Sequence, residues 1–274
     1  MRITSDAGRA AWSALLTDPA STLVCSDFDG VLSPIVANPD EAWASEGTIG
    51  ALARLAGHVA KVAVVTGRPA RQAVRLGRLD ERAGLGSASV LGLYGFERWD
   101  AATGAFDEPA APAGVAEAAA ELPALLAELD LAEARIENKR LSVGVHTREL
   151  TDPAGAFERL AEPLTELAAR HGLRTEPGRF VMELRAEGLD KGDAIHRLVD
   201  EVKPTTIVYA GDDLGDLPAF RAVRELRDAG RVQALLICSG SDEQDALVAV
   251  SDVVVAGPDG VAALWTALAD ELDA

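Results

Sequence analysis

Three polar segments each follow directly after a short apolar run that is rich in β-branched residues. STLVCS leads into Asp27–Gly30, KVAVV leads into Thr66–Arg68, and TTIVYA leads into Gly211–Asp216. In a parallel α/β sheet the carboxyl ends of the strands meet at one edge, where ligands bind. We therefore expect these loops to converge on one crevice. Lys191 opens a predicted helix and is a candidate for the same place.

The carboxylates of these segments predict a divalent cation and a nucleophile. Two acidic clusters on neighbouring loops repel each other unless a cation lies between them, and Mg²⁺ prefers oxygen ligands. The first carboxylate, Asp27, can attack phosphorus to form an aspartyl-phosphate. The second, Asp29, can protonate the leaving oxygen and then deprotonate a water. Gly30 allows a tight loop beside the ligand.

The remaining polar groups suit a phosphate. The hydroxyl of Thr66, the ammonium of Lys191 and the guanidinium of Arg68 can together surround its oxygens. Lysine is scarce here, because most of the 26 basic residues are arginines. Each motif alone is weak, since Asp is also common in surface turns. Their joint occurrence, each at a strand end or a helix start, predicts a phosphoryl-transfer site.

The segments that must position these residues alternate between strand and helix. Strands are predicted at 21–26, 61–65, 89–93, 205–210, 233–238 and 252–255. Helices are predicted at 45–56, 70–79, 191–201, 219–228 and 261–272. This rhythm predicts an α/β, Rossmann-like core with a parallel sheet that is covered by helices.

The middle of the chain follows a different pattern. The sequence predicts a linker at 103–114, helices at 116–129 and 153–171, and a half-exposed antiparallel strand at 135–148. Leu173–Arg185 is typical of a hairpin that turns at Pro177-Gly178. We therefore expect an inserted α+β domain at 98–187, within a core formed by 1–97 and 188–274.

Composition narrows the class of partner. The 274 residues are 48% hydrophobic and 26% charged, which excludes a wholly disordered chain. Lys+Arg 26 against Asp+Glu 44 gives a net charge of −18. Such a chain repels nucleic acid and anionic membranes, so neither is an expected partner. No long apolar stretch or export signal is visible, and Cys25 and Cys238 form no disulfide framework, so we expect a cytoplasmic protein.

The polar segments resemble a known set of motifs. Asp27–Leu32, Thr66–Arg68, Lys191-Gly192 and Gly211–Asp216 resemble, in order, the four motifs of haloacid-dehalogenase-superfamily (HAD) phosphatases. Three segments of the insert, Glu137–Lys139, His146–Arg148 and Met182–Arg185, resemble the cap signatures of trehalose-6-phosphate phosphatases. The resemblance covers nearly the whole chain and implies a HAD core with an inserted, C2-type cap that sets substrate specificity.

The resemblance implies a role for each matching residue. Asp27 would be the nucleophile and a Mg²⁺ ligand, and Asp29 the general acid/base, with its backbone carbonyl on the metal. Thr66 would bind the transferred phosphoryl group and Lys191 would neutralise it. Further metal-site residues would be Asp212, Asp213 and Asp216. The substrate-binding residues would be Arg68, Glu137, Lys139, His146, Arg148 and Glu183.

The activity implied by the resemblance is Mg²⁺-dependent hydrolysis of trehalose 6-phosphate to trehalose and phosphate, as a step of trehalose biosynthesis. The alternative is a phosphatase for another disaccharide phosphate, such as sucrose phosphate or a validoxylamine-type pseudo-disaccharide phosphate. It stays open because Val31, Gly215 and Leu217 depart from the family pattern near the metal site. We expect a phosphorylated disaccharide as the partner, and a monomer or a weak homodimer.

Three other classes of protein fit less well. A receiver domain would be about half this length and would not need Asp29. A nucleotide-sugar glycosyltransferase can hold a metal with Asp-x-Asp but would not require Thr66 or Lys191. A carbohydrate-binding protein without catalytic activity is disfavoured by the intact pair of Asp27 and Asp29.

Overall fold

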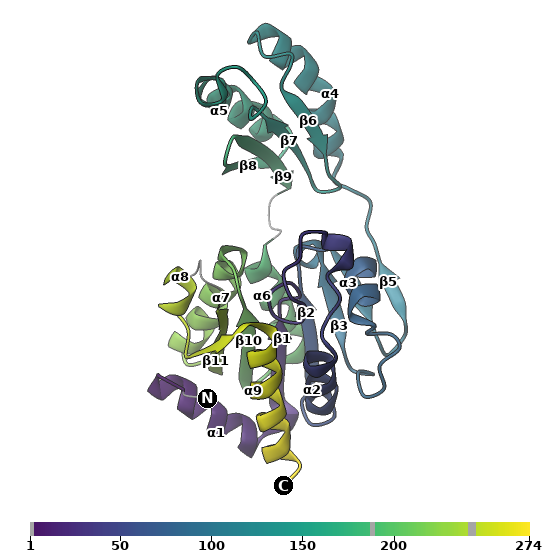
Figure 1. Ribbon diagram of the computed structural model, residues 1–274, viewed down its shortest axis with the longest axis vertical. Coiled ribbons are helices and arrows are strands. Elements are labelled where there is room, and N and C mark those ends of the chain that lie inside the picture. Colours follow the sequence, from purple (N-terminus) through teal and green to yellow (C-terminus); the bar gives the residue numbers. More distant parts are fainter. Residues whose placement is uncertain (1–2, 187–189, 241–244) are drawn as a thin grey trace. The chain divides into compact units, whose positions relative to one another are not determined.

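The computed structural model describes residues 3–186, 190–240 and 245–274, which fall into two units (Figure 1). The core unit comprises Met1–Glu108 and Leu189–Ala274, and the inserted unit comprises Pro109–Gly188. The expected first boundary at residue 97 is wrong, because β4 (Glu97–Asp100) and β5 (Ala105–Asp107) continue the core sheet. The expected boundary at 188 lies outside the described residues.

The core unit is built on an eight-stranded sheet with the order β12-β11-β10-β1-β2-β3-β4-β5. The first six of these strands are parallel, and β4 and β5 are antiparallel additions at one edge. The parallel strands are β1 (Thr22–Ser26), β2 (Lys61–Val65), β3 (Ser89–Gly92), β10 (Thr206–Gly211), β11 (Gln233–Gly240) and β12 (Val253–Ala256). Parallel strands buried on both faces read as continuous apolar runs, which is why the sequence pattern located them.

Helices cover both faces of this sheet. One hydrophobic cluster contains residues of α1 (Asp6–Thr17), α2 (Glu46–Ala56), α3 (Ala70–Gly77) and α9 (Gly257–Leu272). The other contains residues of α6 (Lys191–Val202) and α7 (Leu217–Asp228). Alternate strand residues supply the two clusters, so that Val208 joins the first and Tyr209 the second. Short elements complete the unit: η1 (Pro19–Ser21), η2 (Pro39–Glu41), η3 (Leu93–Gly95), η4 (Leu214–Asp216) and α8 (Asp245–Val248).

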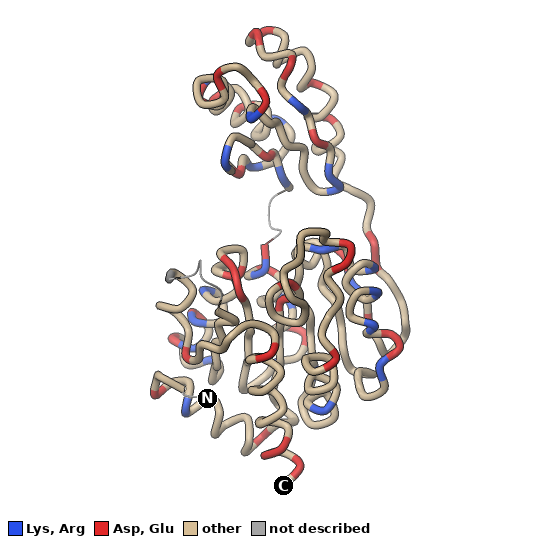
Figure 2. Tube along the Cα trace, viewed as in Figure 1, with Lys and Arg blue, Asp and Glu red and all other residues tan. Residues whose placement is uncertain are grey.

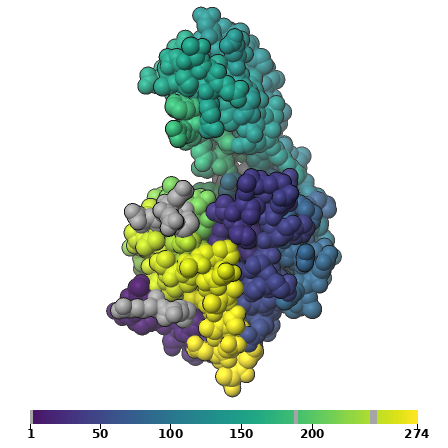
Figure 3. Space-filling view, viewed as in Figure 1, coloured from purple at the N-terminus to yellow at the C-terminus, as the bar shows by residue number. Residues whose placement is uncertain are grey.

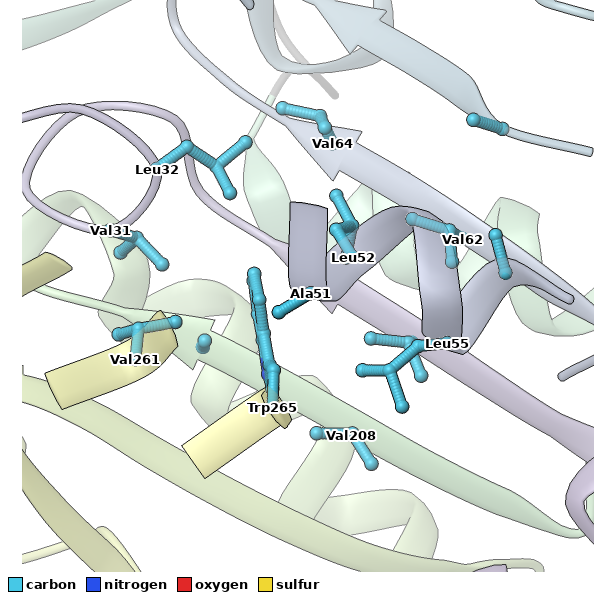
Figure 4. Close-up of a cluster of buried hydrophobic side chains, with 14 of the residues drawn as sticks. Val31, Leu32, Ala51, Leu52, Leu55, Val62, Val64, Val208, Val261 and Trp265 are labelled. Carbon is cyan, nitrogen blue, oxygen red and sulfur yellow. The ribbon is translucent and has the colours of Figure 1, made fainter. Parts of the chain in front are cut away.

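The last helix of the chain supports the loop that follows the first strand. Trp265 of α9 is fully buried and shares a cluster with Leu52 of α2 and with Val31 and Leu32 of that loop (Figure 4). On the face shown in Figure 3, the yellow residues of α9 lie beside the dark blue residues of α2, and the two helices are in contact. The packing of the C-terminal helix therefore helps to hold the Asp27–Leu32 loop in place.

The inserted unit pairs an antiparallel sheet with two helices. The strand order is β6-β7-β9-β8, with bounds β6 (Arg135–Asn138), β7 (Ser142–His146), β9 (Val181–Ala186) and β8 (Leu173–Gly178). The helices are α4 (Ala113–Glu128) and α5 (Pro153–Arg170), and both contact β9. Val143, Val145 and Leu184 are fully buried, whereas their strand neighbours His146 and Glu183 are only partly buried. One face of the sheet therefore packs inward and the other carries polar groups.

Most predicted elements of the core are confirmed to within two residues, but α9 begins four residues early, at Gly257. Three predictions between residues 103 and 185 are wrong. The single strand predicted at 135–148 is a hairpin, β6 and β7, and the linker at 103–114 contains β5 and the start of α4. The predicted Pro177-Gly178 turn lies inside β8, and the chain reverses at Arg179-Phe180, where Phe180 has a φ of 59°.

The surface of both units carries charges of both signs. Figure 2 shows stretches of Lys and Arg (blue) and of Asp and Glu (red) scattered along the trace of both units, although acidic residues predominate in the sequence. Within the described residues, no helix is both long enough and apolar enough to cross a membrane.

Candidate active site

The predicted polar segments converge on one pocket of the core unit. β10, β1 and β2 are adjacent and parallel, so the loops after them leave the same edge of the sheet. The N-terminus of α6 brings Lys191 to the same place. The pocket has a volume of about 520 Å³, and its lining includes Asp27, Asp29, Thr66, Arg68, Tyr94, Lys191, Asp213 and Gly215.

A buried cluster of four charged side chains lies at this edge of the sheet. Asp27, Asp212 and Asp216 are all buried and each offers a carboxylate oxygen within 4.8 Å of the others. Lys191 Nζ lies 2.9 Å from Asp27 Oδ2 and 2.7 Å from Asp216 Oδ1. Three carboxylates against one ammonium leave the cluster with an excess of two negative charges when all are ionised. Uncompensated buried charge is costly, and a divalent cation would balance this excess.

Asp216 uses both of its oxygens within the protein. Its Oδ1 accepts from Lys191 Nζ at 2.7 Å and from Tyr209 Oη at 2.7 Å. Its Oδ2 accepts from the backbone N–H groups of Asp212 at 3.0 Å and Asp213 at 3.3 Å. These bonds tie α6, β10 and the loop after β10 together. Asp216 therefore fits a structural role, in holding Lys191 and this loop, better than the role of metal ligand that the resemblance implies.

Asp212 differs from Asp216 because its carboxylate has no hydrogen-bond donor among the described residues. Burial, and then the charges of Asp216 and Asp213, raise the pKa of Asp212 to about 7. The loop after β1 approaches it closely, since a Cβ on Gly30 would lie 2.0 Å from Asp212 Oδ2. Gly30 has a φ of +67°, which also favours glycine. A buried carboxylate without a donor, beside the Asp27 carboxylate, fits Mg²⁺.

Lys191 lies in an environment that keeps it charged. Burial alone would lower the pKa of its ammonium, but the charges of Asp216 and Asp27 outweigh burial and raise that pKa above its usual value. A cation at a helix N-terminus is unfavourable towards the helix dipole, so these two carboxylates also compensate for its position. Burial raises the pKa of Asp27 well above its usual value, and Lys191 opposes this shift.

The Thr66–Arg68 turn presents a hydroxyl to the pocket. Thr66 Oγ1 accepts a hydrogen bond from the Arg68 backbone N–H at 3.1 Å, which leaves the hydroxyl proton free to be donated. Tyr94 packs closely over this turn, because a Cβ on Gly67 would lie 2.9 Å from Tyr94 Oη. The pocket lining thus includes an aromatic side chain, Tyr94.

The structure places Arg68 and Asp29 together. Arg68 Nε donates to Asp29 Oδ2 and Arg68 Nη2 donates to Asp29 Oδ1, both at 2.7 Å. Arg68 Nη1 donates to the Pro39 carbonyl at 2.8 Å. Arg68 was predicted to bind the substrate, but its guanidinium nitrogens are all engaged within the core unit.

Asp213 is exposed and is absent from the buried cluster. Its Oδ1 accepts from the Gly215 backbone N–H at 2.7 Å, so that it caps η4. It nevertheless lines the pocket. Asp213 is thus available to a ligand from the solvent side, unlike Asp216.

In the inserted unit, four of the predicted substrate-binding residues share the polar face of the sheet. His146 Nε2 and Glu137 Oε2 lie 2.7 Å apart, and Lys139 Nζ is paired with Glu183 Oε1. The hydrogen bond from His146 lowers the pKa of Glu137. Gly144 lies between these pairs, opposite both Glu137 and Glu183 in the sheet. The fifth, Arg148, is exposed beyond the end of β7 and donates to the Arg179 carbonyl instead.

A family model described as trehalose-phosphatase matches residues 25–253, which include both halves of the core site and the whole insert. The chain belongs to the trehalose-phosphatase family. It is 33% identical over 259 residues to the trehalose-phosphate phosphatase of Mycobacterium avium (strain 104). This match covers 90% of the present chain and 62% of the Mycobacterium avium protein. The chain spans between 15% and 62% of the length of the curated relatives it matches.

Solved structures show the same fold as this trehalose-phosphatase family member. The trehalose-6-phosphate phosphatase of Aspergillus fumigatus superposes with a TM-score of 0.78 at 21% identity, covering 98% of this chain and 99% of that chain. A haloacid dehalogenase-like hydrolase from Bacteroides thetaiotaomicron gives a TM-score of 0.61 at 16% identity, covering 90% and 99%. The predicted fold class, a Rossmann-like HAD core with an inserted α+β domain, is confirmed.

Two of the departures from the trehalose-phosphatase pattern are apolar packing residues. Val31 is fully buried in the cluster that contains Trp265, and Leu217 packs against the cluster of α6 and α7. Gly215, the third departure, donates its backbone N–H to Asp213. Val31 and Leu217 therefore keep the loops packed without adding a ligand atom near the cluster.

Sequence reasoning missed two residues that organise this site. Tyr209 is fully buried and donates to Asp216, and Ser239 Oγ donates to the Gly30 carbonyl at 2.6 Å. Tyr209 lies two residues before Gly211, on the sheet face that carries α6 and α7. In the sequence, each of the two residues stands out only as a hydroxyl group in or directly after an apolar strand segment.

Proposed function

We propose that the protein is a Mg²⁺-dependent phosphatase that hydrolyses trehalose 6-phosphate to trehalose and inorganic phosphate. The observation that carries this proposal is the buried cluster of Asp27, Asp212, Asp216 and Lys191, with its excess of two negative charges. Membership of the trehalose-phosphatase family supports the substrate. Such an activity would serve trehalose biosynthesis in the cytoplasm.

In the first half of the reaction, Asp27 is the nucleophile. A carboxylate oxygen of Asp27 forms a bond to phosphorus while the bond between phosphorus and the sugar oxygen breaks. Asp29 donates a proton to that departing oxygen, so that the sugar leaves as a neutral alcohol. The product on the protein is an aspartyl-phosphate.

In the second half, Asp29 accepts a proton from a water molecule. The water oxygen forms a bond to phosphorus and the bond between phosphorus and the Asp27 oxygen breaks. Inorganic phosphate is released and Asp27 returns as a carboxylate. Asp29 is protonated again, so that it is ready to act as the acid in the next cycle.

The surrounding groups bind the transferred phosphoryl group. The Thr66 hydroxyl would donate to one of its oxygens, and the charged Lys191 would offset the negative charge that Asp27 and the phosphate bring together. Asp27, Asp212 and the Asp29 backbone carbonyl would hold Mg²⁺, with Asp213 near the solvent side. When bound, Mg²⁺ would neutralise charge on the phosphoryl oxygens.

The polar face of the inserted unit would bind the sugar. Carboxylate and ammonium groups can accept from and donate to sugar hydroxyls, and Glu137, Lys139, His146 and Glu183 lie together on this face. Gly144 adds no side chain between them, so a sugar ring can approach the strand backbone. We therefore assign this unit the role of a substrate-specificity cap.

A panel of sugar phosphates tests the proposal. The purified chain with Mg²⁺ is offered trehalose 6-phosphate, sucrose phosphate and a pseudo-disaccharide phosphate, and release of inorganic phosphate is measured. Trehalose 6-phosphate should give the highest kcat/KM. A clear preference for one of the other two would establish the alternative substrate while leaving the chemistry intact. Release of phosphate from none of them would refute the proposed function.

The Asp27→Asn variant tests the nucleophile in the same assay. An amide cannot form the aspartyl-phosphate, so turnover should fall below detection. The Asp80→Asn variant, at an exposed position outside this pocket, should keep the activity of the unaltered protein. Substantial turnover by Asp27→Asn would show that a different group attacks phosphorus.

A further inference from the structure

The Arg68 guanidinium donates hydrogen bonds to Asp29, the proposed acid/base, and to the backbone carbonyl of Pro39. Its Nε and Nη2 donate to the two carboxylate oxygens of Asp29, each at 2.7 Å. Its Nη1 donates to the Pro39 carbonyl at 2.8 Å. The guanidinium also lies over the Phe28 ring, 5.5 Å from the ring centroid. The Arg68 side chain is 9% exposed, whereas that of Asp29 is 37% exposed.

This geometry makes Arg68 the fixed partner and Asp29 the movable one. The Arg68 backbone is tied at both ends, because its N–H donates to Thr66 Oγ1 and its carbonyl accepts from the Leu93 N–H. Its guanidinium is held by Pro39 and lies against the buried Phe28. The Asp29 carboxylate has no other hydrogen-bond donor among the described residues. Arg68 therefore sets the direction in which this carboxylate faces.

A bidentate arrangement also has to open before the acid can work. An oxygen of Asp29 that carries a proton is a weaker acceptor than a carboxylate oxygen, and its O–H has to turn towards the departing oxygen. The guanidinium hydrogen bond to that oxygen is therefore the one given up during proton transfer. The other bond can persist and keep the carboxyl group aligned with the departing oxygen. The rigid, planar guanidinium of arginine can keep one of its two hydrogen bonds to Asp29 in place while the other is broken. Lysine has a single ammonium on a flexible stem and does not hold the carboxyl group in the same direction.

We propose that Arg68 is a positioning residue for proton transfer, which aims the Asp29 carboxyl group and releases one of its two oxygens during the reaction. The inference rests on the proposed function, because it takes Asp29 as the general acid/base. It assigns Arg68 to the chemistry of the leaving group and not to recognition of the sugar.

The test compares leaving groups that contain no sugar. Phenyl phosphate has a poor leaving group that needs a proton, whereas p-nitrophenyl phosphate has a good one that needs little help. The Arg68→Lys variant should lose at least about 10-fold more kcat/KM on phenyl phosphate than on p-nitrophenyl phosphate. This is part of the roughly 10²–10⁴-fold that general acid catalysis contributes. The Arg68→Gln variant, which keeps a planar donor without the charge, should show the same selective loss.

A double-variant cycle separates positioning from a structural effect. In an Asp29→Asn background the acid is already absent, so adding Arg68→Lys should no longer change the ratio between the two substrates. Arg71→Lys is the matched control, because Arg71 is exposed and makes a similar two-nitrogen contact with Glu108 outside this pocket. It should leave both kcat/KM values unchanged.

Two outcomes would overturn this inference. One is an equal loss of kcat/KM on both aryl phosphates in folded Arg68→Lys and Arg68→Gln proteins. The other is a selective loss that persists in full in the Asp29→Asn background. Failure of the proposed function looks different, because the unaltered protein with Mg²⁺ would then release no phosphate from trehalose 6-phosphate, whatever the ratio between the two aryl phosphates.

Discussion

At the scale of single residues, the site is governed by how buried charges are matched. Asp216 and Lys191 satisfy each other with the help of Tyr209, so this part of the cluster is complete without a ligand. The Asp212 carboxylate has no such partner among the described residues. Its pKa is raised because the buried, charged form is unfavourable beside other carboxylates. The same strand end therefore holds one carboxylate suited to structure and one suited to a cation.

The charge state of Asp212 predicts a pH-dependent response to Mg²⁺. Its pKa in the folded protein, about 7, lies above the ordinary value of 3.8. The neutral form is thus favoured by folding, and this contribution to stability is lost as the pH rises towards and through 7. Without Mg²⁺, Tm should fall between pH 6 and pH 8, and Mg²⁺ should raise Tm more at pH 8, where no proton has to leave.

Thermal unfolding with and without Mg²⁺ at the two pH values measures this. A loss of ~1 kcal/mol corresponds to about 2–4 °C in a protein of this size class. The Asp212→Asn variant is the comparison, since it cannot titrate there; its Tm should depend less on pH and respond less to Mg²⁺. The same pH dependence and Mg²⁺ response in both proteins would contradict the assignment.

Removing the Tyr209 hydroxyl should lower the free energy of unfolding less than removing the Asp216 charge. The Tyr209→Phe variant removes the hydroxyl that donates to Asp216 Oδ1 but leaves Asp216 three other hydrogen bonds. Hydrogen bonds to charged groups contribute about 1.5–3 kcal/mol, so the free energy of unfolding should fall by about that amount. Asp216→Asn should cost more, because it also removes a charge facing the buried Lys191. Urea unfolding measures both, and the reverse order would refute this account of the network.

At the scale of elements, the site depends on loops that approach each other more closely than most side chains allow. The turn after β1 brings Gly30 against Asp212, and Ser239 at the end of β11 holds the Gly30 carbonyl. The loops after β1 and β10 therefore meet where the Gly30 backbone approaches the Asp212 side chain, and a Cβ on residue 30 would obstruct this approach. This is why a glycine follows Asp-x-Asp here.

The Gly30→Ala variant tests that close approach, and Gly104→Ala is a matched control. Both glycines have similar φ angles, +67° and +68°, but a Cβ at residue 104 would have nothing within 4 Å. Gly104→Ala should therefore cost only the backbone strain, about 1–2 kcal/mol. Gly30→Ala should lower the free energy of unfolding further and reduce the Mg²⁺-induced rise in Tm. Equal costs for the two variants would show that the contact with Asp212 is relaxed easily.

At the scale of the whole molecule, the two units carry different groups of polar residues. All residues of the buried cluster belong to the core unit, and the polar face with Glu137, Lys139, His146 and Glu183 belongs to the inserted unit. In the proposed function the core performs phosphoryl transfer and the inserted unit recognises the sugar. Variants in the inserted unit should therefore affect substrate preference and not the chemistry itself.

The Lys139→Ala variant makes that division measurable. Loss of a charged hydrogen bond to the sugar, about 1.5–3 kcal/mol, should lower kcat/KM for trehalose 6-phosphate by about 10–100-fold. Hydrolysis of p-nitrophenyl phosphate, which has no sugar, should stay within about twofold. Arg170→Ala, which removes another exposed cation paired with a glutamate of the inserted unit, should change neither rate. A parallel loss on both substrates would place Lys139 in the chemistry instead.

Local patterns along the chain were enough to predict which polar groups meet at the edge of the core sheet. Asp27, Thr66 and Asp212 each follow an apolar run, and Lys191 begins a capped helix, so that strand periodicity and helix-start chemistry placed them at one sheet edge. The same reasoning failed at Pro177-Gly178, where a turn dipeptide lies within an edge strand because its register with β9 continues to Gly178. Edge strands tolerate proline, since only one side of the strand needs donors.

The pairing of side chains was decided by tertiary structure. The partners Arg68 and Asp29 lie 39 residues apart, and Lys191 and Asp216 lie 25 apart, so no local pattern shows that they meet. Their contacts depend on strand order and on which sheet face each helix covers. These features turned Arg68 towards Asp29, engaged Asp216 in hydrogen bonds and left the Asp212 carboxylate without a donor among the described residues. The residue types therefore predict the kind of chemistry, whereas the tertiary structure decides which role each group can take. The physical reason is that the protonation and hydrogen bonding of a buried charged group depend on its neighbours in space.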